Sequence, residues 1–382
     1  MESAAVQTLP EVHSHAAPTA PAASQQSPFL SVVIVNYRQW CNTARLVRQL
    51  LNSQAGRSGA GEVVVVDNHS PRHPWRRRLR RMNGVSLRCW GRNRGFAGGV
   101  NEGCRLSRGE WFLLLNPDVT VQPGFLDAAL AYAERIQAQD PAAGIIGFQV
   151  RDPSGAVQPS AGQFPCFAKT LLGVLRKRSA RKCRAVHGHA RKPVAWLTGC
   201  CLLIRRDCFR QLGGFDRDFF LYYEDVNLCR RASQAGWSIW YEPSMHITHH
   251  HPLHGRDVPA CLRMVTRHAL LTYARKHWRH WQFQALTGIV ILEATLRQCR
   301  ERMRQRPDTA RVFGEMKRLA IDMLFGRFAR SRKRLMRIVG KDGGGIRRSE
   351  AGTIISKTTD PGTEMAKTRD HAAPSHVKSA KV

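Results

Sequence analysis

Over residues 29–139, short apolar runs alternate with stretches whose pattern is compatible with helix. The apolar runs cover residues 30–35, 62–66 and 110–115, and a further short strand is expected at residues 85–89. The helical stretches cover residues 41–51, 99–107 and 123–139. Continuous runs of aliphatic residues are typical of strands that are buried on both faces. Strands that alternate with helices predict a parallel sheet with crossover helices, so the expected fold class is α/β.

The second half of the chain predicts one more sheet-forming part and then helices. Residues 150–194 are rich in turn residues and become basic, which indicates a surface loop or, alternatively, a lid or a membrane-facing loop. A strand is expected at residues 195–204 and a helix at residues 226–234. The pattern from about residue 260 to 339 is helical and very basic. We therefore expect a main domain at residues 29–255 and a helical extension at residues 256–340.

Both ends of the chain have the composition of disordered segments. Residues 1–28 are rich in Ala and Pro and lack the basic start and the apolar run of a signal peptide, so they predict a disordered leader. Residues 341–382 begin with glycines and become polar, which predicts a disordered tail. No apolar stretch reaches the roughly 18 residues that span a bilayer. Any membrane contact is therefore expected at the membrane surface.

Polar residues collect where the expected strands end. They are Asn36, Tyr37, Asp67, Asn68, Asn93, Asn116 and Asp118. Ligands of open α/β sheets bind beyond the carboxyl ends of the strands, so these positions are candidate binding residues. The alternative is that Asn and Asp simply end strands and begin turns.

Three carboxylates carry the candidate chemistry. Asp118 directly follows the apolar strand at residues 111–115, where it could hold Mg²⁺ or Mn²⁺, or merely begin a turn after Pro117. Glu224 and Asp225 follow an aromatic run, and apolar surroundings suit a general base. They could instead be the first-turn carboxylates of the helix at residues 226–234, favoured there by the helix dipole.

Two further segments are weaker signals. The Gly-rich segment at residues 91–99 resembles a phosphate-cradling loop, but it follows the third strand and no Gly-Lys-Ser/Thr follows it. The histidines at positions 246, 249, 250, 251 and 254 could bind metal or could be a surface run. The 11 cysteines contain no CxxC pair, which favours reduced thiols in a cytosolic compartment.

Six segments in order carry a family resemblance. They are residues 31–37, 64–70, 93–101, 114–118, 198–206 and 213–225. Together they resemble the family 2 inverting glycosyltransferases, in particular the rhamnosyltransferase-like subgroup, over residues 29–255. The resemblance implies a GT-A fold, which is a Rossmann-like, mostly parallel central sheet flanked by helices. It also implies a nucleoside-diphosphate sugar as donor.

The resemblance implies a role for each matching residue. Asn36, Tyr37 and Asp67 would hold the nucleoside, and Asn93, Gly95 and Phe96 would lie along the nucleotide and the donor sugar. Asn116 stands in the metal motif in place of its first Asp, with Asp118 as metal ligand and His249 near the metal or diphosphate. Asp225 would be the catalytic base, with Glu224 beside it. Asn227 stands where an Asp often follows this pair.

The charge and the C-terminal helical pattern suggest polyanionic partners. The chain has 60 Lys and Arg against 28 Asp and Glu, a formal net charge of +32. Such an excess fits nucleic acid, an anionic membrane or phosphorylated substrates. Residues 312–339 carry an apolar stripe beside basic residues, which favours a helix in the membrane interface. The alternative is a helix packed on the rest of the protein with a solvated basic face.

The combined expectation is an inverting glycosyltransferase of cell-surface polysaccharide synthesis. It would move a hexose or deoxyhexose, such as rhamnose, from a dTDP- or UDP-sugar to a glycan or lipid-diphosphate-linked acceptor, using Mg²⁺ or Mn²⁺. The expected location is cytoplasmic, peripheral on the inner face of the plasma membrane. One alternative is a basic nucleic-acid-binding protein, although no nucleic acid partner is expected because the charge lies outside the sheet-forming segments. The other alternative is a catalytically silent sugar-nucleotide-binding protein, suggested by Asn116 and Asn227.

Overall fold

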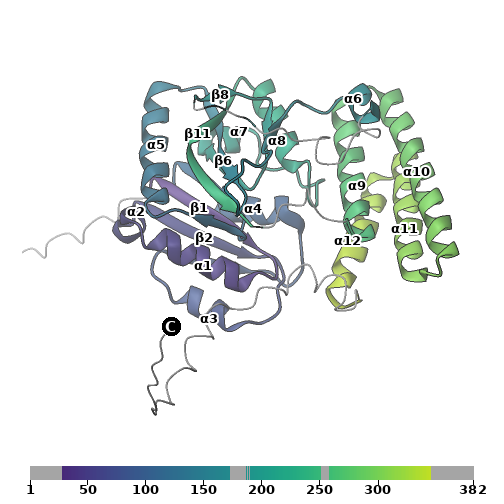
Figure 1. Cartoon of the computed structure of the whole chain (residues 1–382), viewed down its shortest axis with the longest axis horizontal. Coiled ribbons are helices and arrows are strands. Elements are labelled where there is room, and N and C mark those ends of the chain that lie inside the picture. Colours follow the sequence, from purple (N-terminus) through teal and green to yellow (C-terminus); the bar gives the residue numbers. More distant parts are fainter. Residues whose placement is uncertain (1–27, 173–185, 187, 189, 251–257, 346–382) are drawn as a thin grey trace, which may run out of the picture.

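A twisted sheet with helices on both faces lies beside a bundle of C-terminal helices (Figure 1). The structure, a computed structural model, describes residues 28–172, 186, 188, 190–250 and 258–345. The expectations for the leader at residues 1–27, for most of the basic segment after residue 172, for the histidines at 251 and 254, and for the tail after residue 345 lie outside the described residues.

The central sheet has the order β3-β2-β1-β4-β10-β6-β11-β5, with β8 also paired to β11. Its strands are β1 (Leu30–Asn36), β2 (Gly61–Asp67), β3 (Val85–Cys89), β4 (Trp111–Leu115), β5 (Val119–Val121), β6 (Ala143–Arg151), β8 (Lys192–Pro193), β10 (Cys201–Arg205) and β11 (Ser238–His249). β10 runs antiparallel to both of its neighbours, β4 and β6, so these two point the same way. Six strands from β3 to β11 therefore share one direction, and the expected mostly parallel sheet is confirmed.

The side chains of β1 point alternately to the two faces of the sheet, and each set packs against one layer of helices. Leu30, Val32 and Ile34 belong to a core cluster with α1 (Trp40–Leu51) and α5 (Phe125–Gln139). Val33 and Val35 point to the other face, into a cluster with α4 (Gly95–Leu106), α7 (Arg206–Gln211) and α8 (Glu224–Gln234). Successive side chains of a strand point to opposite faces, so a continuous apolar run fills both layers. Short helices α2 (Gln54–Ser58), α3 (Pro74–Arg80) and α6 (Phe167–Leu172) complete this part.

The expected strand at residues 195–204 is interrupted. It forms β9 (Trp196–Leu197), which pairs with β7 (Ala161–Gly162) in a separate ribbon, and then β10 in the central sheet. The residues between them, Thr198 to Cys200, leave the sheet and approach α8. The strands β6 and β11 were not separately expected. The glycines of β6 and the shift in pairing between Glu242 and His246 of β11 disturb the apolar pattern by which strands are recognised.

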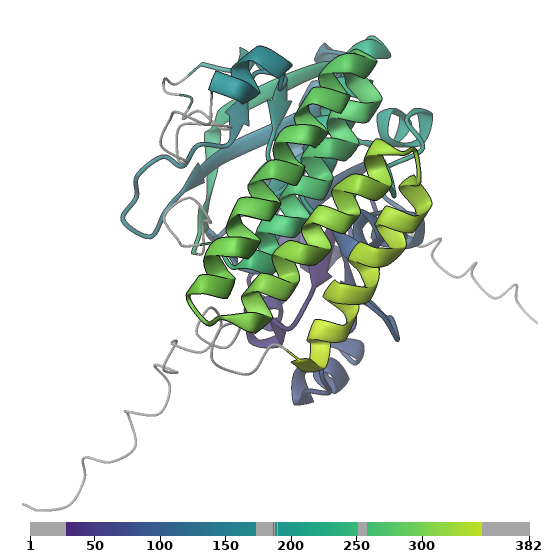
Figure 2. The same ribbon diagram turned by 90° about the vertical axis from the view of Figure 1, so that its right-hand side faces the viewer.

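Four helices form the C-terminal bundle, seen from outside in Figure 2. They are α9 (Ala260–His277), α10 (His280–Met303), α11 (Pro307–Leu324) and α12 (Phe328–Gly345). The stripe expected on one helix at residues 312–339 is divided between α11 and α12, because Gly326 turns the chain with φ +71°. α12 continues to Gly345, past the expected boundary at residue 341.

The apolar stripe of residues 312–339 faces the inside of the bundle. Met316, Leu319 and Leu335 are fully buried, in one cluster with Phe283 and Leu286 of α10. The expectation that this stripe enters a membrane is therefore wrong, and its alternative, a helix packed on the protein, is what the structure shows. A search of the described helices finds none that is long and apolar enough to cross a membrane.

The bundle shares its core with the sheet. Ala269 and Tyr273 of α9 lie in the same cluster as Phe215 and Val226, which cover the sheet. In addition, Phe220 belongs to the cluster of the bundle. The segment that leads into α8 is thus held between the sheet and the helices.

Candidate active site

The ends of β1 and β2 are joined by side chains. Asn36 and Asp67 are partners in the parallel register, and Asn36 Nδ2 donates to Asp67 Oδ1 over 2.8 Å. Asn36 Nδ2 also donates to Ser70 Oγ, while its Oδ1 accepts from the Thr43 hydroxyl at 2.9 Å and the Gln39 N–H at 3.2 Å. These four bonds use the whole capacity of the Asn36 amide, which is fully buried. The structure therefore places Asn36 as the residue that orients Asp67.

Tyr37 and Arg38 follow Asn36 at the mouth of this region. Both are partly exposed, and the Arg38 guanidinium lies 5.2 Å from the centre of the Tyr37 ring. Arg38 has φ +60°, and His69, which follows the end of β2, has φ +71°. A positive φ angle is energetically costly for residues other than glycine, and such residues are concentrated at functional sites.

The Gly-rich segment is held by Asn68, one of the polar residues expected where the strands end. Its Nδ2 donates to Gly95 O at 3.0 Å and its Oδ1 accepts from Arg94 N at 2.8 Å. Asn93 Oδ1 accepts from Gly95 N at 2.9 Å, which closes a tight turn just before α4.

Gly95 is needed for a close approach between two segments. It has φ +82°, and a Cβ there would lie 2.4 Å from the carbonyl oxygen of Phe220. The same carbonyl accepts a hydrogen bond from Phe96 N at 2.8 Å. The Gly-rich segment is thereby pressed against the aromatic run that precedes Glu224 and Asp225.

The two tyrosines before α8 have left-handed backbone conformations. Tyr222 and Tyr223 have φ +72° and +65°. Each non-glycine residue in this region costs on the order of 1–3 kcal/mol, so the surrounding contacts must impose the conformation. The turn places Glu224 and Asp225 in the first turn of α8, where the helix dipole favours negative charge, as the alternative interpretation expected.

Two backbone groups fix the Asp225 carboxylate. Oδ1 accepts from Val226 N at 2.8 Å, and Oδ2 accepts from Gly199 N at 3.1 Å. The side chain of Phe96 also lies beside Gly199, because a Cβ at Gly199 would be 3.4 Å from Phe96 and 3.7 Å from Asp225. Asp225 is 7% exposed and Glu224 is 4% exposed. The interruption between β9 and β10 therefore serves to bring Gly199 against the candidate base.

Asp118 meets His249 through the pairing of β5 with β11. Val119 and His249 are partners in the antiparallel register, and His249 Nε2 lies 3.5 Å from Asp118 Oδ1. His250 N donates to the carbonyl of Asp118 at 3.1 Å. His250 itself lies with its Nε2 2.5 Å from the Thr120 hydroxyl, on the neighbouring strand.

Gln158 selects the ring nitrogen that His249 presents to Asp118. Its Nε2 donates to the carbonyls of His249 and Arg151, which turns its Oε1 toward His249 Nδ1 at 3.2 Å. An acceptor at Nδ1 requires the proton on Nδ1, so Nε2 presents its lone pair in the neutral imidazole. A lone pair and a carboxylate oxygen 3.5 Å apart form a pair of ligands that favours a cation.

Two hydrogen bonds connect the Asp118 region to Asp225. Asn116 N donates to Cys200 O at 3.1 Å, and the residue before Cys200, Gly199, donates to Asp225. Asn116 and Asp118 both follow β4, whose end lies beside the start of β10 in the sheet. The candidate metal ligand and the candidate base therefore both lie near the carboxyl end of β4.

Helix α8, which carries the candidate base, is joined to the bundle through Asn227. His277 Nε2 lies 2.8 Å from Asn227 Oδ1, and Arg230 donates to the Tyr273 hydroxyl at 3.1 Å. Burial, followed by the charge of Arg230, lowers the pKa of His277 to about 4. A neutral His277 donates from Nε2 to Asn227. Asn227, which stands where an Asp is often found, therefore has a matching hydrogen-bond partner on α9.

Comparison with known proteins places these features in one family. The family described as glycosyltransferase like family 2 matches residues 27–282 of the chain. The chain belongs to this family. The expected recognition, a glycosyltransferase of family 2, is thus confirmed, and with it the transferase assignment. The mostly parallel sheet flanked by helices confirms the α/β class.

Several relatives of this family 2 glycosyltransferase are known. The N-acetylglucosaminyl-diphospho-decaprenol L-rhamnosyltransferase of Mycobacterium tuberculosis is 37% identical over 212 residues, covering 50% of this chain and 67% of the relative. The rhamnosyltransferase WbbL of Escherichia coli K12 is 27% identical over 40% of this chain and 56% of its own length. The mannosyltransferase PcManGT of Pyrobaculum calidifontis, solved with GDP-Man and Mn²⁺, is 16% identical with a TM-score of 0.46, over 86% of this chain and 90% of its own.

The ligand set of this glycosyltransferase fits a cation shared with a substrate. Within the described residues, no three His, Cys, Asp or Glu side chains come together as a closed metal cluster. Asp118 and His249 supply one oxygen and one nitrogen, and Mg²⁺ or Mn²⁺ sites of this kind take their remaining ligands from phosphate and water. The two side chains therefore fit a divalent cation that binds together with a diphosphate.

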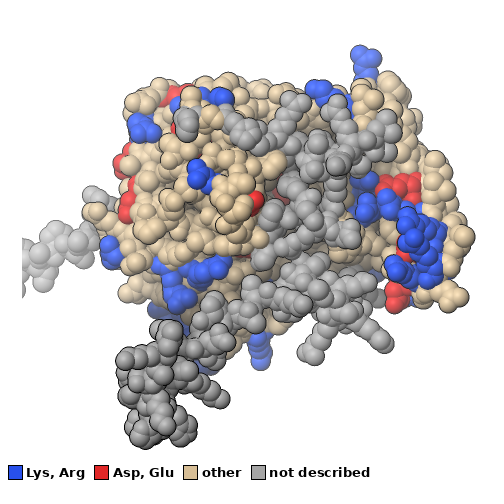
Figure 3. Space-filling view, viewed as in Figure 1, with Lys and Arg blue, Asp and Glu red and all other residues tan. Residues whose placement is uncertain are grey.

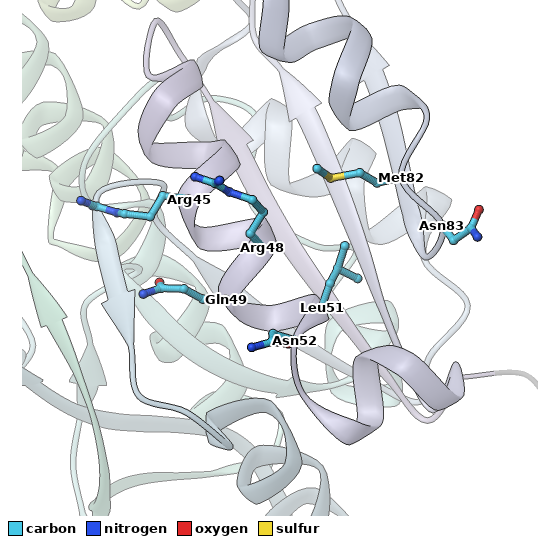
Figure 4. A pocket seen from close by; sticks show the side chains of 7 residues that line it. All are labelled: Arg45, Arg48, Gln49, Leu51, Asn52, Met82 and Asn83. Atoms are coloured by element: carbon cyan, nitrogen blue, oxygen red, sulfur yellow. The ribbon is translucent and has the colours of Figure 1, made fainter. Parts of the chain in front are cut away.

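A separate groove of about 670 Å³ lies away from this site. Figure 4 shows Arg45, Arg48 and Gln49 of α1 on one side and Met82 and Asn83, which follow α3, on the other. Leu51 and Asn52 at its floor lie at the end of α1, and Asn83 comes just before β3 begins. This end of the groove therefore lies at the amino edge of the sheet, opposite the edge that carries Asp67 and Asp118.

Proposed function

We propose that this glycosyltransferase transfers a hexose or deoxyhexose, such as rhamnose, from a dTDP- or UDP-sugar to a lipid-diphosphate-linked acceptor, with inversion at the anomeric carbon. The observation that carries the proposal is the pair of hydrogen bonds, from Asn116 to Cys200 and from Gly199 to Asp225, that links the segment of Asp118 to Asp225. The name of the M. tuberculosis relative, which specifies a diphospho-decaprenol acceptor and rhamnose, supports the choice of substrates. Such an acceptor suits an enzyme on the cytoplasmic face of the plasma membrane.

Asp225 is the proposed base. Its carboxylate takes the proton of the acceptor hydroxyl while the hydroxyl oxygen attacks the anomeric carbon on the side opposite to the diphosphate. The bond to the diphosphate breaks in the same displacement, so the configuration inverts and the nucleoside diphosphate leaves. The Gly199 and Val226 N–H groups hold the carboxylate in one orientation during this step.

The donor site is proposed to lie across the ends of β1, β2 and β4. Asp67, oriented by Asn36, and Tyr37 would contact the nucleoside, while Asn93, Gly95 and Phe96 would line the nucleotide and sugar. Asp118 and His249 would hold Mg²⁺ or Mn²⁺, which neutralises charge on a departing diphosphate. Asn116, whose N–H is bonded to Cys200, would position Asp118.

The Asp225→Asn variant tests the proposed base. We expect transfer from dTDP-rhamnose to a short-chain prenyl-diphosphate N-acetylglucosamine, measured with Mn²⁺, to fall by about 10²–10⁴-fold, because the amide cannot accept the proton. Nucleotide binding, followed by thermal shift with dTDP and Mn²⁺, should persist. The product linkage, read by NMR, should be inverted relative to the donor.

The exposed Asp207 on α7 offers the matched control, since Asp207→Asn makes the same chemical change outside the site. It should leave transfer unchanged. A normal rate in Asp225→Asn would refute the assignment of the base. A wild-type chain that binds the nucleotides of a donor panel and transfers from none of them would instead favour a catalytically silent sugar-nucleotide-binding protein.

A further inference from the structure

The outer side of α10 carries a row of exposed apolar side chains. Trp281, Ile289, Leu292, Leu296 and Met303 are 56%, 37%, 59%, 62% and 85% exposed. They recur at intervals that keep them on one side of a helix. The row, here called the α10 stripe, extends for about 33 Å at 1.5 Å per residue. Figure 2 shows α10 crossing the outside of the bundle.

The stripe is not needed to hold the bundle together. The opposite side of α10 supplies Phe283, Leu286 and Val290 to the buried cluster shared with α9 and α11. α10 is thus apolar on two sides, and only one of them is covered. Contiguous exposed apolar surface of this kind marks an interaction site in soluble proteins.

The helix α6 extends the apolar surface at the start of α10. The Phe167 ring packs edge to face on Trp278 and Trp281, with centroids 6.0 and 5.4 Å apart. Leu171 and Leu172, at the end of α6, are 46% and 59% exposed. Residues from two distant parts of the chain therefore contribute to one apolar surface.

Basic side chains flank the stripe at both ends. Arg279 and His280 are exposed at its start, and Arg300, Arg302 and Arg304 are exposed at its end. Figure 3 shows Lys and Arg gathered over the helical bundle at the right-hand edge of the molecule. The flanks thus carry the charge that an anionic surface attracts.

The carboxylates of α10 do not offset this charge. Glu293 is half-buried between Arg267 and Arg297, at 2.6 and 3.0 Å, and Glu301 lies within 3.9 Å of Arg306. Both acids are therefore partly covered and paired, and the outward charge of this side is positive.

The charge argues against a second copy of the chain as the occupant. A twofold dimer through α10 would bring Arg300 and Arg302 of one copy against either the same residues or Arg279 of the other. Both arrangements oppose like charges, whereas an anionic leaflet attracts all of them. Apolar side chains between basic flanks are the pattern of helices that lie in a membrane interface.

We propose that the α10 stripe, together with Leu171 and Leu172, docks on an anionic lipid bilayer with α10 parallel to its surface. This deepens the proposed function, because a lipid-diphosphate acceptor is held in a bilayer. The contacts of Asn227 with His277 and of Arg230 with Tyr273 join α8 to α9, so docking would also fix the orientation of α8 relative to the membrane.

Vesicle sedimentation tests the proposal without any sugar transfer. The full chain is mixed with vesicles of equal parts phosphatidylglycerol and phosphatidylcholine, and with vesicles of phosphatidylcholine alone. We expect binding to the anionic vesicles and a loss of about tenfold or more in affinity in the Leu292→Glu/Leu296→Glu variant. The Arg300→Gln/Arg302→Gln/Arg304→Gln variant should lose the preference for phosphatidylglycerol.

The matched control adds the same two charges elsewhere. Ala131 and Ala138 are exposed on α5, which lies at the opposite side of the molecule from α10 in Figure 1. The Ala131→Glu/Ala138→Glu variant should bind vesicles like the wild type. Equal loss in both variants would show that charge alone controls binding and would overturn the stripe as the docking face.

Light scattering separates the bilayer from a second copy. A wild-type chain that is dimeric without lipid, and becomes monomeric in the Leu292→Glu/Leu296→Glu variant, would overturn the proposal. Retained thermal shift with dTDP and Mn²⁺ in that variant shows that the donor site is intact. Failure of vesicle binding therefore leaves the transferase proposal standing, and loss of transfer in Asp225→Asn leaves the docking proposal standing.

Discussion

Asp118 and His249 come from positions 131 residues apart and are brought together by one short antiparallel pairing. Gln158 then fixes the imidazole so that Nε2 faces the carboxylate. Partners of this kind orient metal-binding histidines and raise their affinity. Replacing His249 is therefore a direct test of the proposed metal site.

The His249→Ala variant should need at least about tenfold more Mn²⁺ for half-maximal transfer, because a metal ligand that Gln158 holds in place is lost. The measurement is the rate of transfer over a Mn²⁺ titration. His246 lies on the same strand and is bonded to Gln122, at 2.9 Å, so His246→Ala is the matched control. An unchanged Mn²⁺ requirement in His249→Ala would remove this residue from the metal site.

The site could be predicted from the sequence where a residue ends a strand. Asp67 and Asp118 follow apolar runs directly, and Asp225 follows an aromatic run, so the chain itself marks them. Gln158 and Gly199 carry no such mark, because their roles depend on His249 and Asp225, which are 91 and 26 residues away. Contacts of that span are set by the folded sheet and cannot be inferred from local pattern.

At the scale of elements, α11 shows how the bundle is held together. Met316, Leu319 and Met323 recur at helical spacing and pack against α9 and α10. Ser331 of α12 also donates to the carbonyl of Leu319 at 3.1 Å. The order of the bundle therefore depends on this buried side of α11.

The Leu319→Ala variant should lower the free energy of unfolding by about 2–5 kcal/mol, since it removes a fully buried side chain and leaves a cavity. Urea unfolding followed by circular dichroism gives the value. Leu292→Ala makes the same change on the exposed side of α10 and should cost less than about 0.5 kcal/mol. Comparable losses at the two positions would mean that the outer side of α10 is also buried.

Among the first four strands of the parallel part, β1, β2 and β4 could be predicted because their apolar runs are almost unbroken, and β3 because apolar and polar residues alternate along it. β3 has the expected bounds, and β1, β2 and β4 differ from the expected strands by only a residue or so at either end. The amphipathic pattern at residues 312–339 correctly marked an apolar side but not its partner. Periodicity says which side of a helix is apolar, and a lipid surface and a neighbouring helix satisfy it equally well.

At the scale of the whole molecule, the positive charge extends into the bundle and acts on a buried histidine. His268 on α9 is 3% exposed. Burial, with a further contribution from the charge of Arg332, lowers the pKa of His268 from 6.5 to about 4. The folded chain therefore keeps His268 neutral at a pH where the unfolded chain protonates it.

Stability should decrease as the pH falls from about 6.5 to about 4, because protons then bind the unfolded state in preference. Above this window His268 is neutral in both states and has no effect. Urea midpoints measured across the window should fall less in His268→Leu than in the wild type. His280→Leu, at an exposed position of α10, should keep the wild-type slope. Equal slopes in wild type and His268→Leu would contradict the assignment.

The aromatic run before Asp225 is held in place by contacts on two sides. The Phe220 carbonyl receives the Phe96 N–H, while the Phe220 side chain is buried among the helices of the bundle. A truncated chain that ends before α9 would expose this side chain and would lose Tyr273 and His277, which brace α8. A minimal catalytic fragment must therefore keep the C-terminal helices, because they support the left-handed turn that orients Asp225.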